Sequence, residues 1–169
     1  MRPPISVREG RQGDAPDVAA IYNEGIRERN ATFETRERSP SEVIPWLTSE
    51  RYPMLVAYIG DEILGWIAAS QYRPRECYTG IAEFSVYVAR RARGLGIGDT
   101  LMRDFLPALQ LAGFWKVLSR IFPENAASRA LCARHGFREV GLYTNHARLD
   151  GRWRDVLIVE RLLSAAADQ

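Results

Sequence analysis

Arg91-Ala92-Arg93-Gly94-Leu95-Gly96 fits the pattern Q/R-x-x-G-x-G/A. It follows an alternating run, Glu83 to Val88, that is typical of a strand, and it precedes a helical pattern that begins near Gly98. Glycines allow the backbone to curl closely around an anion, and the N-terminus of the following helix adds free N–H groups and a positive dipole end. The stretch therefore predicts a turn that binds a pyrophosphate.

Other glycine-rich phosphate sites fit this stretch less well. Gly94, Gly96 and Gly98 run G-x-G-x-G, whereas a dinucleotide-binding fingerprint needs G-x-G-x-x-G and a P-loop needs G-x-x-x-x-G-K-[ST]. A plain strand-to-helix turn with a solvated basic rim is the structural alternative. The arginines from Arg90 to Arg93 also leave open a nucleic-acid-binding module, whose affinity would fall steeply with salt.

A second motif lies downstream, at Asn125-Ala126-Ala127-Ser128, and its helix is expected to end before Gly136-Phe137. The two segments, in this order and at this separation, resemble the GNAT acetyltransferases, whose acetyl-CoA sites pair an R/Q-x-x-G-x-G/A loop with a downstream N-x-x-S…G-F helix. The resemblance covers nearly the whole chain. It implies one acetyltransferase domain over residues 1–169, acetyl-CoA as co-substrate, and a mixed α/β (α+β) GNAT fold. In that fold about seven mostly antiparallel, twisted strands are flanked by about four helices.

The remaining sequence patterns agree with a mixed sheet that has helices on its faces. Asp14, followed by Asp17, predicts the N-cap of the first helix. Gly113 predicts the C-cap of the helix that follows the glycine turn. Strands are expected at 5–9, 54–59, 63–72, 83–88, 115–122, 137–149 and 153–163, with helices after Asp14, after Ser39, from about 98 to 112 and over 125–135.

The composition is ordinary for a globular protein and argues against several classes of partner. With 23 basic and 21 acidic side chains the net charge is +2, which gives no support for nucleic acid or a membrane. Cys77 and Cys132, the only cysteines, do not form a zinc-site spacing with His135 and His146, nor a disulfide framework. We expect no bound metal and, because the N-terminus lacks the apolar segment of a signal peptide, a cytoplasmic location.

Six further segments carry more specific information: Ile21-Tyr22-Asn23-Glu24, Thr32-Phe33-Glu34, Arg51-Tyr52-Pro53, residues 75–78, residues 83–88, and Gly151-Arg152-Trp153-Arg154-Asp155-Val156. They resemble the phosphinothricin and methionine sulfoximine N-acetyltransferases and their arsinothricin-acetylating relatives. This resemblance implies a small amino-acid-like acceptor that is acetylated on its α-amino group, and it implies a homodimer. The apolar run from Val156 to Val159, in the last predicted strand, is the expected dimer contact.

For the reaction, the resemblance implies that Glu83 is the general base, because an α-ammonium group must lose a proton before its nitrogen attacks the thioester. The backbone of the same strand would bind the pantetheine arm and polarise the thioester carbonyl. Asn125 fits both a contact to CoA and an N-cap. The expected cofactor-binding residues are Val86, Tyr87, Val88, Arg91, Arg93, Gly94, Leu95, Gly96, Ile97, Gly98, Asn125 and Ser128.

The group that protonates the departing CoA thiolate is open. Many GNAT enzymes have tyrosine seven residues after the asparagine, the phosphinothricin group tends to have histidine there, and this chain has Cys132. A thiol with an ordinary pKa of about 8.5 could act catalytically as this acid. A small buried packing residue explains Cys132 equally well. Solvent, Tyr87 and Tyr143 are the other candidates.

Residues that bind the acceptor are expected on several segments. Arg73 and Arg75 lie on the loop before the catalytic strand, and their guanidinium groups suit a carboxylate together with a phosphinate-like oxyanion. Phe33, Tyr78 and Tyr22 are candidate walls of the pocket, and His146 matches a region near the acceptor site of the relatives. The alternative functions are acetylation of another amine, such as an aminoglycoside or a protein N-terminus, and a non-catalytic acyl-CoA-binding sensor.

Overall fold

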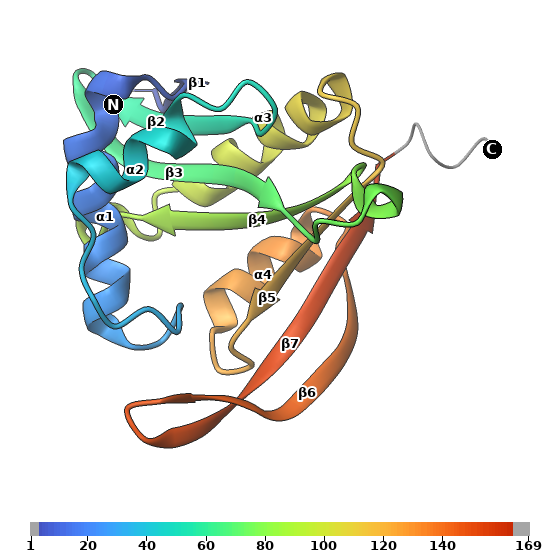
Figure 1. Cartoon of the computed structure of the whole chain (residues 1–169). Helices are drawn as coiled ribbons and strands as arrows, with labels where there is room; N and C mark the ends of the chain where they lie inside the picture. Colours follow the sequence, from blue (N-terminus) through green and yellow to red (C-terminus); the bar gives the residue numbers. More distant parts are fainter. Residues whose placement is uncertain (1–3, 164–169) are drawn as a thin grey trace.

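One sheet of seven strands runs through the computed structural model, which describes residues 4–163 (Figure 1). Its order is β1-β2-β3-β4-β5-β7-β6, and every neighbouring pair is antiparallel except β4 with β5. The sheet and its helices confirm the mixed, mostly antiparallel architecture expected from the sequence. The strands are β1 (Ser6–Glu9), β2 (Met54–Ile59), β3 (Glu62–Gln71), β4 (Ile81–Val88), β5 (Lys116–Ile121), β6 (Arg138–Leu149) and β7 (Arg152–Leu162).

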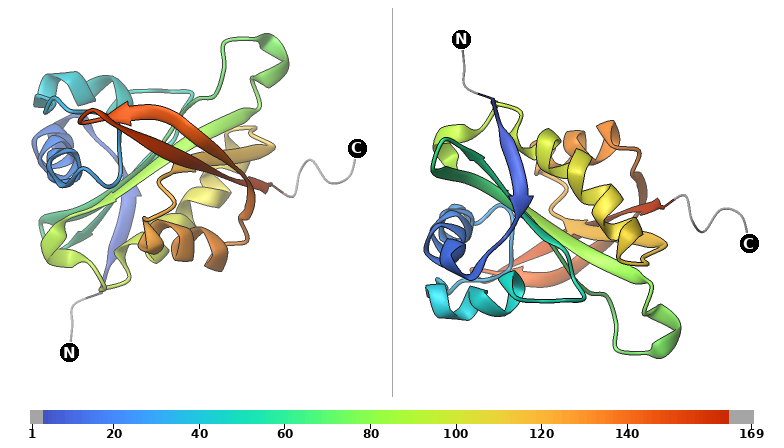
Figure 2. Two further views of the ribbon diagram at one scale, coloured as in Figure 1. Left: turned by 90° about the horizontal axis from the view of Figure 1, so that it is seen from below. Right: turned by 90° about the horizontal axis from the view of Figure 1, so that it is seen from above.

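Helices cover both faces of the sheet, with α1 and α2 on one face and α3 and α4 on the other (Figure 2). Their apolar sides supply much of the core, since α1 buries Val18 and Ile26 while α3 buries Phe105 and Leu109. Within residues 4–163 no helix has the length and apolar character needed to cross a bilayer. The helices are α1 (Ala15–Glu28), α2 (Pro40–Leu47), α3 (Ile97–Leu111) and α4 (Ala126–Arg134).

The end of α3 shows why the sequence stops this helix where it does. Gly113 adopts φ +86°, a left-handed conformation that favours glycine. Its N–H donates to Gln110 O at 3.0 Å, and the N–H of Phe114 donates to Leu109 O at 3.1 Å. These are the two hydrogen bonds of a Schellman motif. The prediction that Gly113 ends the helix is confirmed.

The pairing of β4 with β5 sets the position of the site. The two parallel strands pair only where Ile81, Ala82 and Glu83 lie beside residues 116–118. Beyond that point they separate, although β4 stays paired with β3 as far as Val88. In its second half, β4 is therefore hydrogen-bonded to β3 along one edge, while its other edge is not paired with β5.

Two local predictions need correction. Asp14 is the N-cap residue of α1, as predicted, but its side chain does not cap the helix; its carboxylate instead accepts the Arg11 N–H at 2.7 Å and pairs with Arg8 at 2.8 Å. The run from Val156 to Val159 is not an open strand edge, because β7 pairs with β5 on one side and with β6 on the other. This apolar run finds its partners within the chain, and β6 is the strand at the edge of the sheet.

We expect Asp14→Ala to lower the free energy of unfolding by about 1–3 kcal/mol, because the largely buried carboxylate receives two hydrogen bonds from Arg8. These hydrogen bonds lower the pKa of Asp14 below its ordinary value. A carboxyl whose pKa is lower in the folded than in the unfolded chain stabilises the fold above the unfolded pKa, and this contribution disappears as the pH falls through the folded value. Urea unfolding at neutral pH and at about pH 3 measures both effects. An equal difference between variant and wild type at the two pH values would contradict the assignment.

Candidate active site

The turn from β4 into α3 presents backbone N–H groups at a helix end. Gly94 and Gly96 adopt φ values of +77° and +89°, which glycine reaches without strain. Gly96 is the N-cap of α3, and Thr100 N–H donates to Gly96 O at 3.0 Å as the first bond of the helix. The N–H groups of the first turn precede that bond and have no carbonyl of the helix to pair with. Such an end is a ready site for a phosphate or pyrophosphate.

A cavity of about 600 Å³, here called the cofactor cavity, opens beside this turn. Asn125 shapes one wall by capping α4, where its side-chain oxygen accepts the Ser128 N–H at 3.1 Å. Ten of the twelve residues expected to bind the cofactor line this cavity. They are Val86, Tyr87, Val88, Arg93, Gly94, Gly96, Ile97, Gly98, Asn125 and Ser128.

Glu28, near the end of α1, organises the basic side chains of the turn. Its Oε2 lies 2.9 Å from Arg93 Nη2, and its Oε1 lies 3.0 Å from Arg90 Nε. The carboxylate is only 11% exposed and lines the cofactor cavity. Glu28 thereby holds Arg90 and Arg93 beside the turn, and Arg93 itself lines the cofactor cavity.

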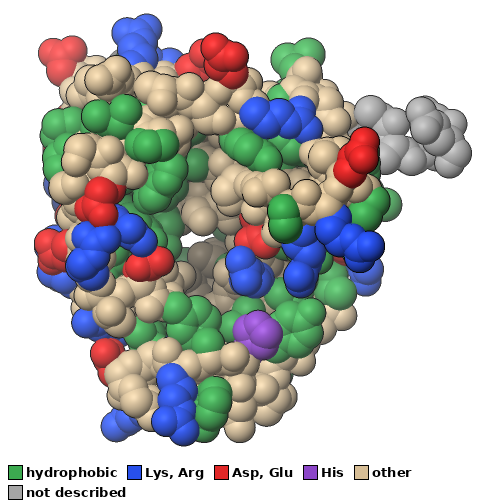
Figure 3. Space-filling view, viewed as in Figure 1, with side chains coloured by type: hydrophobic (Ala, Val, Ile, Leu, Met, Phe, Trp, Pro, Cys, Tyr) green, Lys and Arg blue, Asp and Glu red, His purple; other side chains and the backbone are tan. Residues whose placement is uncertain are grey.

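A second cavity, of about 370 Å³ and here called the acceptor cavity, contains Glu83. The Glu83 side chain is 16% exposed, and its Oε2 accepts a hydrogen bond from Arg120 Nη2 at 2.9 Å. Figure 3 shows this face of the molecule hollowed near its centre, with acidic and basic side chains around the hollow. The cavity is lined by Tyr22, Ala31, Thr32, Phe33, Glu34, Glu83, Phe84, Ser85, Tyr87, Ser119, Arg120, Ile121, Phe122, His146, Ala147 and Val156.

A narrow space of about 70 Å³ lies between the two cavities and shares lining residues with both. It lies where β4 and β5 separate, and there Ser119 donates its hydroxyl hydrogen to Phe84 O at 2.9 Å. Cys132 lines the same space and is 3% exposed. Burial raises the pKa of the Cys132 thiol to about 11. A group that passes from one cavity to the other would cross this space.

Tyr87 lines both cavities and the space between them. Its ring meets Tyr22 edge to face, with the ring centroids 4.9 Å apart. Gly25 permits this position, because a Cβ there would lie 2.7 Å from the Tyr87 ring. Burial raises the pKa of Tyr87 above its ordinary value, so the phenol stays protonated at neutral pH.

Five residues predicted to belong to the site line neither the two cavities nor the narrow space between them: Arg91, Leu95, Arg73, Arg75 and Tyr78. Arg91 pairs with Glu62 at 2.6 Å, and Leu95 packs against the core. The other three lie on the connection from β3 to β4, where the Tyr78 ring meets the Tyr72 ring at 5.5 Å. A role for these three residues in binding the acceptor stays a prediction.

Charged residues that line the two cavities and were not predicted from the sequence include Glu28, Asp99, Arg134 and Arg120. Glu28 had a signal, because Glu24 and Glu28 lie four residues apart on α1 and so share a face of the helix. Glu24 uses that face to accept the Arg90 N–H at 2.8 Å. Arg120 had no local signal, since only the parallel pairing of β4 with β5 brings it beside Glu83.

Comparisons with known proteins agree with this geometry. The model of the acetyltransferase (GNAT) family matches residues 18–137. Phosphinothricin N-acetyltransferase of Streptomyces coelicolor is 38% identical, over 94% of this chain and 96% of that protein. L-methionine sulfoximine/L-methionine sulfone acetyltransferase of Pseudomonas aeruginosa is 30% identical, over 92% of this chain and 92% of that protein.

A solved structure gives the same result. The GNAT superfamily phosphinothricin acetyltransferase from Sinorhizobium meliloti, crystallised in complex with acetyl-CoA, superposes with a TM-score of 0.91 at 28% identity. The match covers 98% of this chain and 91% of that one. The chain therefore belongs to the acetyltransferase (GNAT) family and is an N-acetyltransferase, related over nearly its full length to phosphinothricin and methionine sulfoximine N-acetyltransferases.

Proposed function

We propose that the chain transfers the acetyl group of acetyl-CoA to the α-amino group of a small amino-acid-like acceptor, such as phosphinothricin, methionine sulfoximine or arsinothricin. The observation that carries this proposal is the meeting of two cavities where β4 and β5 separate, with a glycine turn at one end and Glu83 at the other. The relatives named above support this class of acceptor, since two are phosphinothricin acetyltransferases and one is a methionine sulfoximine/methionine sulfone acetyltransferase.

In this proposal the cofactor occupies the cofactor cavity. The pyrophosphate accepts hydrogen bonds from the N–H groups at the start of α3, and Arg93 adds positive charge. The pantetheine arm runs along the unpaired edge of β4 at Val86, Tyr87 and Val88, as a further strand would. A backbone N–H of this edge polarises the thioester carbonyl, which stabilises negative charge on its oxygen during the reaction.

In this proposal the acceptor reacts from the other cavity. Glu83 removes a proton from the acceptor's ammonium group, directly or through a water molecule, and the neutral nitrogen attacks the carbonyl carbon of the thioester. The attacking nitrogen then gives up a second proton to solvent, the C–S bond breaks to leave an amide, and CoA leaves as a thiolate that takes up a proton. Arg120 holds one oxygen of the Glu83 carboxylate, and its remaining donors suit the carboxylate of an amino acid.

Cys132 is a weak candidate for the acid that protonates the thiolate. Because burial raises its pKa to about 11, the thiol holds its proton more tightly than an ordinary alkyl thiol does. We therefore expect Cys132→Ala to keep kcat within about threefold of wild type, since acid catalysis typically contributes at least a hundredfold. Steady-state kinetics at saturating acetyl-CoA measures the effect. A hundredfold loss in kcat with an unchanged melting temperature would make Cys132 the acid.

We also propose that the enzyme is a homodimer, with the contact on the hairpin of β6 and β7. Apolar side chains are exposed there, namely Val140, Leu142, Tyr143 and Trp153, each between 45% and 52% accessible in the single chain. Exposed apolar side chains on a hairpin at the edge of the sheet favour contact with a second chain. Light scattering after size-exclusion chromatography would give the mass, and Leu142→Glu should convert a dimer into a monomer. A monomeric wild-type protein would refute the proposal.

A thiol-release assay tests the function directly. Acetyl-CoA is combined with phosphinothricin, methionine sulfoximine, methionine sulfone, arsinothricin, free amino acids, an aminoglycoside and a peptide with a free N-terminus. We expect release of CoA only with the amino-acid-like acceptors. Turnover restricted to the aminoglycoside or the peptide would overturn the acceptor class, and tight CoA binding without any turnover would indicate a sensor.

A further inference from the structure

Arg154 and Asp155 are adjacent residues of β7, within the segment Gly151 to Val156 that no step of the proposed reaction uses. They are not among the residues that line the two cavities. Each nevertheless contacts a segment that forms a wall of the acceptor cavity. Arg154 reaches the loop between α1 and α2, and Asp155 reaches an irregular part of β6.

Arg154 connects three parts of the chain that lie far apart in sequence. Its Nη1 donates to the backbone oxygen of Arg29 at 3.3 Å, and its Nη2 lies 3.4 Å from Oε2 of Glu124. Its guanidinium carbon also lies 4.2 Å from the centroid of the Phe122 ring. Phe122 in turn meets Phe33 edge to face at 4.9 Å. Since Phe122 and Phe33 both line the acceptor cavity, Arg154 supports this wall from behind.

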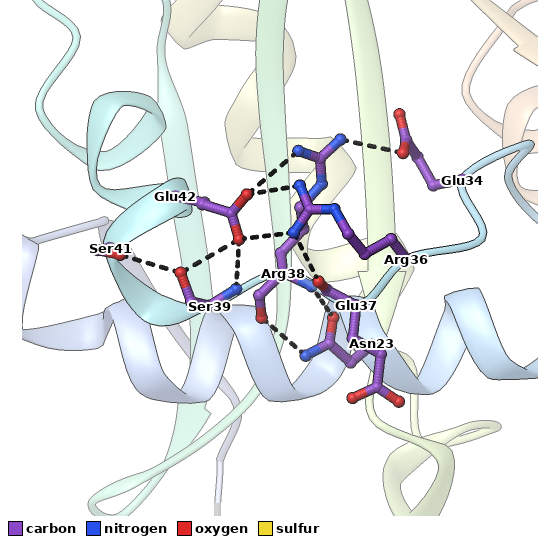
Figure 4. A network of polar contacts seen from close by, with 8 residues as sticks. All are labelled: Asn23, Glu34, Arg36, Glu37, Arg38, Ser39, Ser41 and Glu42. Carbon is purple, nitrogen blue, oxygen red and sulfur yellow. Dashed lines mark hydrogen bonds and ion pairs between the residues drawn. The ribbon is translucent and has the colours of Figure 1, made fainter.

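The loop that Arg154 holds, residues 29–39, is fixed at both ends. At its start Arg29 adopts φ +59° and its side chain pairs with Asp150 at 3.2 Å. At its end, Figure 4 shows Asn23 exchanging two hydrogen bonds with the Arg38 backbone, at 2.9 and 2.8 Å, while Arg38 pairs with Glu34 at 3.0 Å. The middle of the loop, residues 31–34, lines the acceptor cavity. The loop is therefore held at both ends, and the hydrogen bond from Arg154 is one of the contacts at its start.

Asp155 holds the other wall. Between the pairs Tyr143–Val156 and Ala147–Arg154, β6 has residues 144–146 where β7 has only Asp155. Within this bulge Asn145 adopts φ +50°, and its N–H donates to the Asp155 carboxylate at 2.8 Å. The next two residues, His146 and Ala147, line the acceptor cavity. Bulges of this kind redirect side chains beside active sites.

We propose that Arg154 and Asp155 are positioning residues for the acceptor: Arg154 sets the wall formed by residues 31–34, and Asp155 sets the wall formed by His146 and Ala147. The two residues alternate along a strand, so their side chains leave β7 on opposite faces and act on separate segments. This inference rests on the proposed function, because that function makes the acceptor cavity the place where the acceptor binds. The positions of the two walls can also be measured with no acceptor present.

The first experiment compares Arg154→Ala, Arg154→Lys and the control Arg152→Ala, which removes an exposed arginine of the same hairpin. For Arg154→Ala we expect faster backbone hydrogen exchange in residues 29–34 and a tenfold to hundredfold lower kcat/KM for the acceptor, with the Kd for acetyl-CoA within about twofold of wild type. Lysine keeps the charge over the Phe122 ring and should restore part of both losses. Exchange in residues 29–34 equal to wild type in Arg154→Ala would overturn the inference, whatever acceptor the enzyme uses.

The second experiment compares Asp155→Ala with Asp155→Asn. The asparagine amide oxygen can accept the Asn145 N–H, whereas alanine cannot. We expect faster exchange in residues 143–147 and a higher KM for the acceptor in Asp155→Ala, with both restored in Asp155→Asn. Equal defects in the two variants would refute positioning through this hydrogen bond. If the wild-type protein turned over no acceptor, the proposed function would fail while the exchange data still decided the positioning.

Discussion

Replacing Glu83 with glutamine is expected to lower kcat by about a hundredfold to ten-thousandfold, the usual contribution of a general base. Glutamine has nearly the same shape and can still accept a hydrogen bond from Arg120, which contacts Glu83 Oε2 at 2.9 Å. The amide cannot take a proton from the acceptor's ammonium group. Because Glu83 lines the acceptor cavity and not the cofactor cavity, the Kd for acetyl-CoA should stay within about twofold of wild type.

Two further variants make this prediction specific. Glu34 is the other carboxylate that lines the acceptor cavity, and it pairs with Arg38 at 3.0 Å. If Glu34→Gln lost more activity than Glu83→Gln, the base would be Glu34. Glu139→Gln is a control, because it removes an exposed carboxylate of β6 that pairs with Arg129 outside both cavities. Stopped assays with saturating acetyl-CoA give kcat, and calorimetry gives the Kd. Unchanged turnover in Glu83→Gln would remove this residue from the mechanism.

The parts of the site that the sequence predicted are those encoded by local backbone geometry. Gly94 and Gly96 are needed because the turn uses positive φ angles, and Asn125 is needed because α4 requires an N-cap. Each of these needs depends on a few neighbouring residues. Many residues of the cofactor cavity could therefore be predicted from two short motifs. Arg91 is an exception, because its guanidinium group pairs with Glu62 instead.

The acceptor cavity was less predictable because its walls come from distant segments. Arg120 contacts Glu83 only because β5 lies parallel to β4, and Phe33 reaches Phe122 only because a loop after α1 folds over β5. The strand order gives another example. An apolar run such as Val156 to Val159 is equally consistent with a dimer contact and with an interior strand, and only the pairing with β5 and β6 distinguishes them.

The glycine turn provides the second large effect, since Gly96→Val is expected to weaken acetyl-CoA binding by about tenfold to a hundredfold. Gly96 adopts φ +89°, which a β-branched residue does not tolerate, although a Cβ there would meet no atom within 4 Å. The strain is therefore in the backbone. If the backbone relaxes toward negative φ, the N–H groups at the start of α3 rotate away from their positions. Loss of one charge-assisted hydrogen bond, which contributes about 1.5–3 kcal/mol, corresponds to this loss of affinity.

Gly60→Val is the matched control for this effect. Gly60 adopts φ +59° in the turn between β2 and β3, also with no atom within 4 Å of an added Cβ, and it does not line the cofactor cavity. Both variants should therefore lose a similar free energy of unfolding, about 1–2 kcal/mol for the left-handed backbone. Only Gly96→Val should lose affinity for acetyl-CoA and for CoA when each is titrated by calorimetry. If the two variants bound CoA equally well, the N–H groups of this turn would not hold the pyrophosphate, and the site would have to be sought elsewhere in the cavity.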